Sequence, residues 1–256
     1  MTLTLVITFY DGDCHLIEPF LRHLGSSNFS DIDEIILIST GTTNVLSEIT
    51  KANLNIPGHT KLHIIESSVR RSQATARNFG ISTSTCEVVA FNDGDDFPHP
   101  SKFSIIKTIF KSLPDLDWLC HDTVEDMTEL IRKNYAGLTP PLCVAPPGVS
   151  RFGEVPIFEN GKVASGASSL SVRRHVLESI RYSEKAMDYR HEDTEFIWKI
   201  FSSGFVGAYL DWPLCTYRPS GTERLVTDMI RYSKYIDGDP ESLKKYFISR
   251  GVSYDF

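Results

Sequence analysis

The stretch that decides the fold covers residues 88–96 and reads Val88-Val89-Ala90-Phe91-Asn92-Asp93-Gly94-Asp95-Asp96. Its apolar first half predicts a buried strand, so the three carboxylates that follow lie where a parallel strand would end. Ligands of open α/β sheets bind at this end of the strands. Carboxylates this close repel one another unless a cation lies between them, and Mg²⁺ or Mn²⁺ prefers such oxygen ligands. A solvated acidic turn is the alternative, because Gly and Asp are also good turn residues.

The composition is that of an ordinary globular protein. The 256 residues are 41% hydrophobic and 23% charged, and this length allows one large α/β domain or two small ones. A net charge of −7 argues against nucleic acid as a partner. The five cysteines are widely spaced and form no CxxC pair, which favours free thiols in a reducing compartment over disulfides or a zinc site.

The N-terminal residues 1–7 lack a basic region and lead directly into Asp11 and Asp13. They are typical of a first strand rather than of a signal peptide. No apolar stretch has the length of a membrane span. We therefore expect a cytoplasmic protein, and a peripheral contact with the inner face of a membrane stays open.

Strands and helices are predicted to alternate along the first half of the chain. The apolar patterns indicate strands at 3–9, 34–39, 62–65, 88–91 and 116–120, and helices at 16–24, 45–53, 72–82 and 102–111. This order predicts an α/β fold with a mainly parallel sheet and helices on both faces.

The pattern changes after about residue 125. Residues 139–161 are rich in Pro and Gly and predict a loop-rich insertion. A strand is expected at 167–172, on the far side of the sheet, and a helix at 192–201. Residues 223–250 are charged and helical in pattern, and we expect them to pack back on the domain.

Five segments, taken in order, resemble a known family. They are Val6–Asp11, Glu34–Thr43, the run Ala76-Arg77-Asn78-Phe79-Gly80-Ile81, the DxD-like turn Asp93-Gly94-Asp95-Asp96, and Gly166–Arg174 followed by Glu192-Asp193. With this set the chain resembles the inverting glycosyltransferases of family 2, which have the GT-A fold. The resemblance covers roughly residues 3–220.

The resemblance implies a single Rossmann-like GT-A domain at 1–220 and a C-terminal helical extension at 221–256. Within the domain, 1–96 would bind the nucleotide sugar and 97–220 the acceptor. The implied reaction is metal-dependent, inverting transfer of a sugar from a nucleotide-diphosphate sugar to a hydroxyl group. The acceptor would be a glycan or glycolipid, in the synthesis of a surface polysaccharide or glycoconjugate.

The resemblance also implies roles for individual residues. Mn²⁺ or Mg²⁺ would bind Asp95 and Asp93, Asp193 would be the general base, and Glu192 would orient the acceptor or the base. Taken alone, the last two could simply be acids that favour a helix N-terminus. The implied donor-binding residues are Thr8, Phe9, Tyr10, Asp11, Ser39, Arg77, Asn78, Asp93 and Gly94. The implied acceptor-binding residues are Gly166, Ser168 and Ser169, and a plain edge strand is the alternative for this segment.

Several positions depart from the family pattern, among them Thr8, where Pro is common. Ser39 and Thr40 stand where many relatives carry Asp residues, the first of which contacts uracil, so the donor nucleotide stays open. Ser220 stands where a His is frequent. The last three departures motivate a second hypothesis, a non-catalytic nucleotide- or glycan-binding subunit of a larger assembly. A third, Mg²⁺-dependent phosphoryl or nucleotidyl transfer, would use the same acids, although no P-loop motif is present.

Overall fold

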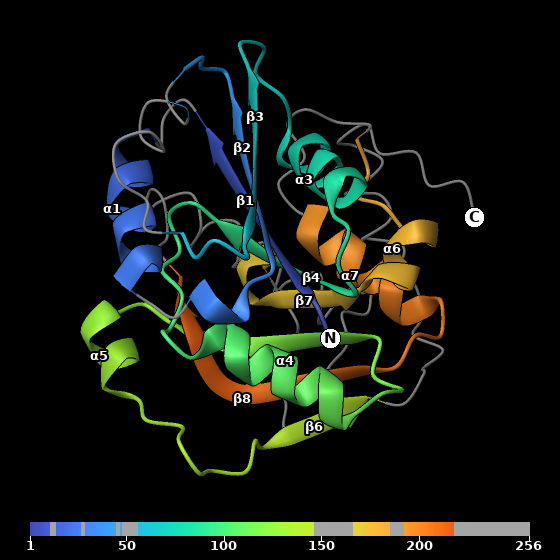
Figure 1. The fold of residues 1–256 in the computed structure, drawn as a ribbon. Coiled ribbons are helices and arrows are strands. Elements are labelled where there is room, and N and C mark those ends of the chain that lie inside the picture. The colour runs from blue at the N-terminus through green and yellow to red at the C-terminus, as the bar shows by residue number, and fades with distance from the viewer. Residues whose placement is uncertain are drawn as a thin grey trace.

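The computed structural model describes residues 1–10, 14–26, 29–44, 47, 56–145, 166–184 and 192–217. Within these residues eight strands form one mixed sheet in the order β3-β2-β1-β4-β7-β5-β8-β6, with helices on both faces (Figure 1). The α/β class, the mainly parallel sheet and its two helical layers are therefore confirmed.

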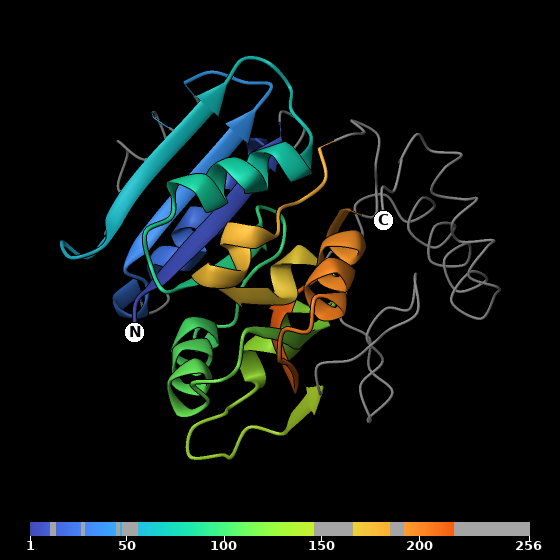
Figure 2. The same ribbon diagram turned by 90° about the vertical axis from the view of Figure 1, so that its right-hand side faces the viewer.

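The first half of the sheet is entirely parallel. It consists of β1 (Leu3–Tyr10), β2 (Glu34–Thr40), β3 (Lys61–Ser67) and β4 (Val88–Asp93), in which β1 pairs with both β2 and β4. All four strands lie at their predicted places. Figure 2 shows β2 and β3 side by side with their arrowheads at the same edge, so the carboxyl ends of these strands are neighbours.

The second half mixes strand directions. It consists of β5 (Trp118–Val124), β6 (Leu142–Ala145), β7 (Leu170–Arg173) and β8 (Gly207–Thr216). Strand β7 runs antiparallel between β4 and β5, and β6 antiparallel to β8, whereas β5 and β8 are parallel. The strand expected at 167–172 is present as β7, but it begins three residues later, and its expected place on the far side of the sheet is wrong. Its first residues form the 3₁₀ turn η3 (Ala167–Ser169), and β7 occupies the centre of the sheet, where both of its edges find partners.

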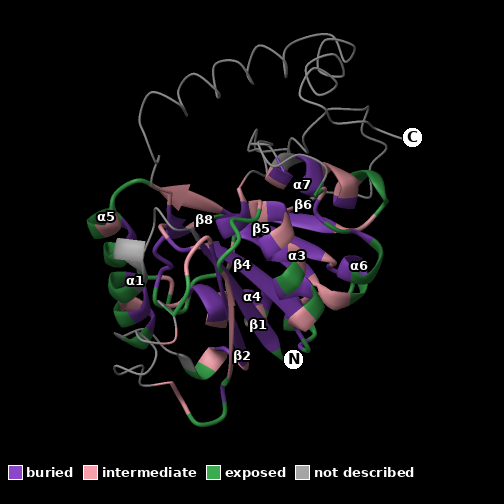
Figure 3. Ribbon diagram, turned by 90° about the horizontal axis from the view of Figure 1, so that it is seen from above, coloured by how far each residue is buried: buried purple, intermediate pink, exposed green. Residues whose placement is uncertain are grey.

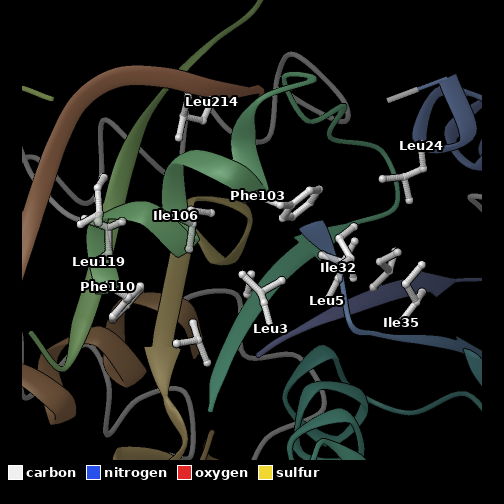
Figure 4. Packing of buried hydrophobic residues seen from close by; sticks show 14 of the residues in the cluster. Leu3, Leu5, Leu24, Ile32, Ile35, Phe103, Ile106, Phe110, Leu119 and Leu214 are labelled. Carbon is white, nitrogen blue, oxygen red and sulfur yellow. The ribbon is translucent and has the colours of Figure 1, made fainter. Parts of the chain in front are cut away.

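The helices form two layers because successive apolar side chains of a strand point to opposite faces of the sheet, and both faces must be covered. Leu3, Leu5 and Ile7 face α1 (Cys14–Ser26) and α4 (Lys102–Ser112), with the turn η2 (Phe29–Asp31) nearby. Figure 4 shows this cluster. The intervening Val6 faces the other layer, which contains α3 (Gln73–Thr83), α6 (Arg174–Ser179) and α7 (Glu192–Ser202). The short helix α5 (Met127–Arg132) lies beside β8. Figure 3 shows buried strands between helices whose outer sides are exposed.

Several segments expected from the sequence lie wholly or partly outside the residues that the structure describes. All but one residue of the expected helix at 45–53, most of 139–161 and the whole of 221–256 lie outside the described residues. The loop-rich insertion nevertheless contains β6, which sequence analysis missed. Cys86, Cys120, Cys143 and Cys215 are free thiols, as expected. In the described part of the chain, no helix combines the length and apolar character needed to cross a bilayer.

Candidate functional site

The centre of the candidate site is Arg77, on α3. The helix begins after Ser72, whose hydroxyl accepts a hydrogen bond from the Thr75 backbone N–H at 3.1 Å. It lies close against the sheet because Gly80 has no side chain, and a Cβ there would overlap Val6. This close packing brings α3 against β1 and β2. It buries Arg77 to 1% exposure, so its guanidinium must find partners inside the protein.

The guanidinium of Arg77 binds three carboxyl groups. One nitrogen donates to both oxygens of Asp93, at 2.8 and 3.1 Å. The other donates to Glu192 at 2.9 Å and to Asp193 at 2.5 Å. The planar fork of arginine is suited to such multiple contacts with carboxylates. Arg77 therefore joins the acid at the end of β4 to the acidic pair at the start of α7, which lies more than ninety positions further along the sequence.

Two backbone contacts complete this connection. The second oxygen of Asp193 accepts a hydrogen bond from the Ala167 N–H at 3.1 Å. The Ser168 hydroxyl accepts one from the Asp93 N–H at 2.9 Å. Asp93, Arg77, Asp193 and the Ala167–Ser168 turn thus form a closed ring of contacts. The ring fixes the expected metal ligand, the expected base and the expected acceptor segment relative to one another.

The charges in this cluster are unbalanced. Burial works to lower the pKa of Arg77, but Asp193 and Asp93 outweigh it and hold that pKa above its usual range. Burial, together with the neighbouring Asp193, raises the pKa of Glu192 to about 8. Glu192 is therefore harder to ionise than an ordinary glutamate, and one guanidinium faces three acids. The site keeps an excess of negative charge, which favours a cation.

The turn after β4 carries the remaining acids. Asp96 N–H donates to the Asp93 carbonyl at 3.2 Å, and Gly94 N–H donates to the Thr8 carbonyl at 3.0 Å. Gly94 lies on the ring of Phe9, where any Cβ would overlap that ring. Asp95 is partly exposed. The sequence could not indicate that the glycine between the two acids is required by an aromatic ring below it.

The turn has the chemistry of a hard-cation site. Asp93 and Asp95 offer carboxylate oxygens, and Asp93 keeps an exposed fraction of 19%. Among the described residues, no group of three or more His, Cys, Asp or Glu side chains is arranged around a metal position. The protein could thus supply two carboxylates and leave the other positions to phosphate and water, which is the usual arrangement for Mg²⁺ beside a nucleotide.

Other predicted donor residues differ in their surroundings. The Thr8 hydroxyl donates to Asp93 at 3.1 Å and so belongs to the cluster. Phe9 is fully buried and packs edge-on against Phe20, so only its backbone can meet a ligand. Asn78 holds the backbone of Tyr182 through its amide, at 2.9 and 3.1 Å, and therefore fixes the segment after α6.

The other predicted positions lie at the ends of β1 and β2, beside the η3 turn, or outside what can be described. Ser39 is buried at the end of β2, and its hydroxyl is 2.9 Å from that of Thr42. Gly166 has a φ of 84°, a backbone conformation that favours glycine, and its carbonyl accepts a hydrogen bond from the Ser169 hydroxyl at 2.9 Å. Tyr10 ends β1, but its side chain, Asp11 and Ser220 lie outside the described parts.

Sequence analysis missed two residues of this region. Lys102, on α4, is 1% exposed, and its ammonium donates to the side chain of Asn92, just before the Asp93–Asp96 turn, and to the Ser168 carbonyl. The sequence feature that could have revealed it is the place of this lysine in the apolar stripe of the helix, in line with Ile106 and Ile109. Tyr182 is stacked on Phe196, with its ring centroid 5.3 Å from the Arg77 guanidinium carbon. Within the described part of the chain its buried hydroxyl has no hydrogen-bond partner.

Comparison with known families decides the identity of the fold. Residues 4–176 match the model of glycosyl transferase family 2. The chain belongs to this family. The resemblance deduced from the five segments is therefore confirmed, and the sheet with its helices is the GT-A fold of these glycosyltransferases. No curated protein sequence matches the chain.

Solved structures agree with this GT-A glycosyltransferase fold. S. aureus TarS (residues 1–349) in complex with UDP-GlcNAc has a TM-score of 0.65 and 14% identity, over 94% of this chain and 68% of TarS 1–349. The mannosyltransferase PcManGT from Pyrobaculum calidifontis, in complex with GDP-Man and Mn²⁺, has a TM-score of 0.58 and 17% identity. That match covers 93% of this chain and 65% of PcManGT. At these identities the likeness concerns the fold.

Proposed function

We propose that the protein is a metal-dependent, inverting glycosyltransferase that moves a sugar from a nucleotide-diphosphate sugar to a hydroxyl acceptor. The observation that carries the proposal is Arg77, whose single guanidinium binds Asp93 at the DxD-like turn and Asp193 at the start of α7. An inverting displacement needs a leaving-group site and a base on opposite sides of one sugar, and this arrangement supplies a candidate for each.

The acids of the turn would serve the leaving group. When bound by Asp95 and Asp93, Mn²⁺ or Mg²⁺ would neutralise the charge that develops on the departing diphosphate. PcManGT, a structural relative, was solved with GDP-Man and Mn²⁺, which supports the choice of cation. Thr8 would keep Asp93 in place, because its hydroxyl donates to that carboxylate.

Asp193 would act as the general base. Its side chain is 22% exposed, and each of its oxygens accepts one hydrogen bond in the structure. Because a carboxylate has about four lone-pair positions, it can still accept the proton of an acceptor hydroxyl. The oxygen of the acceptor hydroxyl forms a bond to the anomeric carbon. At the same time the bond between that carbon and the phosphate oxygen breaks, and the nucleoside diphosphate leaves with the electron pair. Because burial raises the pKa of Glu192, that residue would keep a proton more readily and leave Asp193 as the base.

The nucleotide base of the sugar donor would meet a hydroxyl group of the protein rather than a carboxylate. The Ser39 hydroxyl is paired with Thr42, whereas that of Thr40 is buried and has no hydrogen-bond partner among the described residues. A hydroxyl can donate or accept, so this strand end does not restrict the nucleotide to UDP. We propose a glycan or glycolipid acceptor from a surface polysaccharide or glycoconjugate, in line with the family resemblance.

A donor panel tests the proposal. UDP-GlcNAc, GDP-Man and other nucleotide sugars are incubated with the protein and Mn²⁺ or EDTA, and the released nucleotide is quantified. We expect one donor class to be hydrolysed or transferred only with metal, and ¹H NMR of the product to show inversion at the anomeric carbon. If no donor is turned over and no nucleotide diphosphate raises the melting temperature with Mn²⁺, the proposal fails. The non-catalytic hypothesis, motivated by Ser39 and Thr40, would then replace it.

A further inference from the structure

Lys102 is a buried charge that the proposed reaction does not use. It lies in the first turn of α4 beside Phe103, with an exposed fraction of 1%. Removing an ammonium group from water costs several kcal/mol unless its donors are satisfied. Its Nζ donates to the Asn92 side-chain oxygen at 2.9 Å and to the Ser168 carbonyl at 2.7 Å. Both partners adjoin the candidate site.

The first contact controls the orientation of Asn92. Since an ammonium can only donate, it holds the amide oxygen of Asn92 and turns the amide nitrogen toward the acidic turn. That nitrogen donates to the carbonyls of Asp93 and Asp96, at 2.7 and 2.6 Å. The two carbonyls bracket Asp95, so the amide of Asn92 fixes the shape of the turn that carries it.

The second contact reaches the acceptor-side segment. Ser168 receives Lys102 on its carbonyl, while its hydroxyl accepts the Asp93 N–H at 2.9 Å. Lys102 therefore holds the turn after β4 from one side and the η3 turn from the other. Within the described residues it is the lysine whose ammonium joins these two segments.

We propose that Lys102 is a positioning residue that holds the Asp93–Asp96 turn and the Gly166–Ser169 segment in register, and thereby sets the affinity of the turn for its cation. The part that concerns the cation rests on the proposed function. Residues that orient metal ligands typically change metal affinity or activity by about 10–100-fold when they are replaced. We expect an effect of this size for Lys102, although its ammonium contacts no group that reacts.

The first experiment needs no ligand. Amide hydrogen exchange is measured for the full chain, for Lys102→Met and for Lys107→Met, a lysine of the same helix that instead pairs with Asp33 at 2.9 Å. We expect Lys102→Met to speed exchange at residues 93–97 and 166–169 together by about tenfold or more, and Lys107→Met to leave both segments unchanged. Unchanged exchange in folded Lys102→Met, or acceleration at only one segment, would overturn the proposal.

Asn92→Asp is the second variant, and it keeps the test decisive if Lys102→Met does not fold. The new carboxylate can still accept from Lys102 but cannot donate to the two turn carbonyls. We expect faster exchange at 93–97 with the buried charge retained. Unchanged exchange at these amides would contradict the proposed route through Asn92.

The second experiment measures the cation directly. Mn²⁺ is titrated with GDP or UDP present, and free Mn²⁺ is followed by electron paramagnetic resonance. We expect Lys102→Met and Asn92→Asp to weaken Mn²⁺ binding by about 10–100-fold, and Lys107→Met to match the parent. Equal Mn²⁺ affinity in the folded variants overturns the role in cation binding. If the parent chain itself binds no Mn²⁺, the metal-dependent function fails, whereas the exchange result still decides whether Lys102 joins the two segments.

Discussion

The two halves of the sheet supply their site residues in different ways. In the parallel half, β1 and β4 end side by side, and Thr8 pairs in register with Asp93, so the position of the Asp93–Asp96 turn follows from the strand order itself. In the mixed half, Asp193 lies at the start of helix α7. Ser168 lies in the 3₁₀ turn that directly precedes strand β7. Half of the candidate site is thus fixed by strand pairing, and half by long-range tertiary contacts through Arg77.

The largest expected effect comes from the mixed half. Asp193→Asn keeps the size of the side chain and removes its basicity, so turnover should fall by about 10²–10⁴-fold. Donor hydrolysis and transfer rates measure this, and a thermal melt checks that the variant is folded. Asp115→Asn, the same chemical change at an exposed position before β5, is the matched control. If Asp193→Asn turned over at the parent rate, Asp193 would not be the general base, and the mixed half of the sheet would not supply it.

Arg77→Met tests the link between the halves. Removing one partner from a buried ionic group leaves carboxylates without their counter-charge, which costs about 3–5 kcal/mol of unfolding free energy. Chemical denaturation measures the loss. Arg22→Met removes an exposed pair with Glu18 and should cost no more than about 1 kcal/mol. Similar losses for both variants would show that Arg77 does not join the halves energetically.

Glu192 gives a pH-dependent version of the same test. Burial raises its folded-state pKa to about 8 from the 4.5 of an ordinary glutamate, so its contribution to stability is complete below about pH 4.5 and is lost as pH rises through about 8. Glu192→Gln imitates the protonated acid. Relative to the parent, it should gain roughly 1–3 kcal/mol of unfolding free energy between pH 6 and pH 9. Denaturation curves at both pH values measure the gain, and a constant difference would contradict the raised pKa.

The smallest expected effect lies in the parallel half, at the start of α3. Ser72→Ala removes the hydroxyl that caps this helix, which should cost about 1 kcal/mol of stability. Ser104→Ala removes a hydroxyl inside α4, where it donates to the Ser101 carbonyl, and should change stability by less than about 0.5 kcal/mol. Thermal melts of the two variants measure the difference. An equal loss would mean that the cap does not hold the helix that carries Arg77.

The sequence predicted the parallel half well for a physical reason. Strands β1, β2 and β4 are continuous apolar runs, and the sterics of right-handed crossovers leave few ways to join them. The acids at the end of β4 and the acidic pair at the start of α7 were likewise visible, as local patterns and through the family resemblance. Arg77 was among the implied donor-binding residues, and the structure pairs it with Asp93 of the DxD-like turn.

The remainder depended on contacts that no local pattern encodes. The position of β7 between β4 and β5 follows from pairing with both strands, and a four-residue strand has too short a pattern to reveal its neighbours. Glu195 is a charged residue in the first turn of α7, yet it is buried and pairs with Lys199 at 2.7 Å. Lys102 was overlooked because a single lysine in a helix is usually exposed, although its place in the apolar stripe of α4 was visible.

The central position of β7 has a consequence for the order in which the protein folds during synthesis. Residues 1–93, which carry all four strands of the parallel half, leave the ribosome before residues 170–173, because synthesis runs from the N-terminus and takes about a second for each 5–20 residues. The outer edge of β4 then lacks its partner until residues 170–173 emerge, and an unpaired strand edge is prone to association with other chains. The nascent chain therefore carries its DxD-like turn next to an open edge, and closing that edge is the same event that brings Ser168 to Asp93.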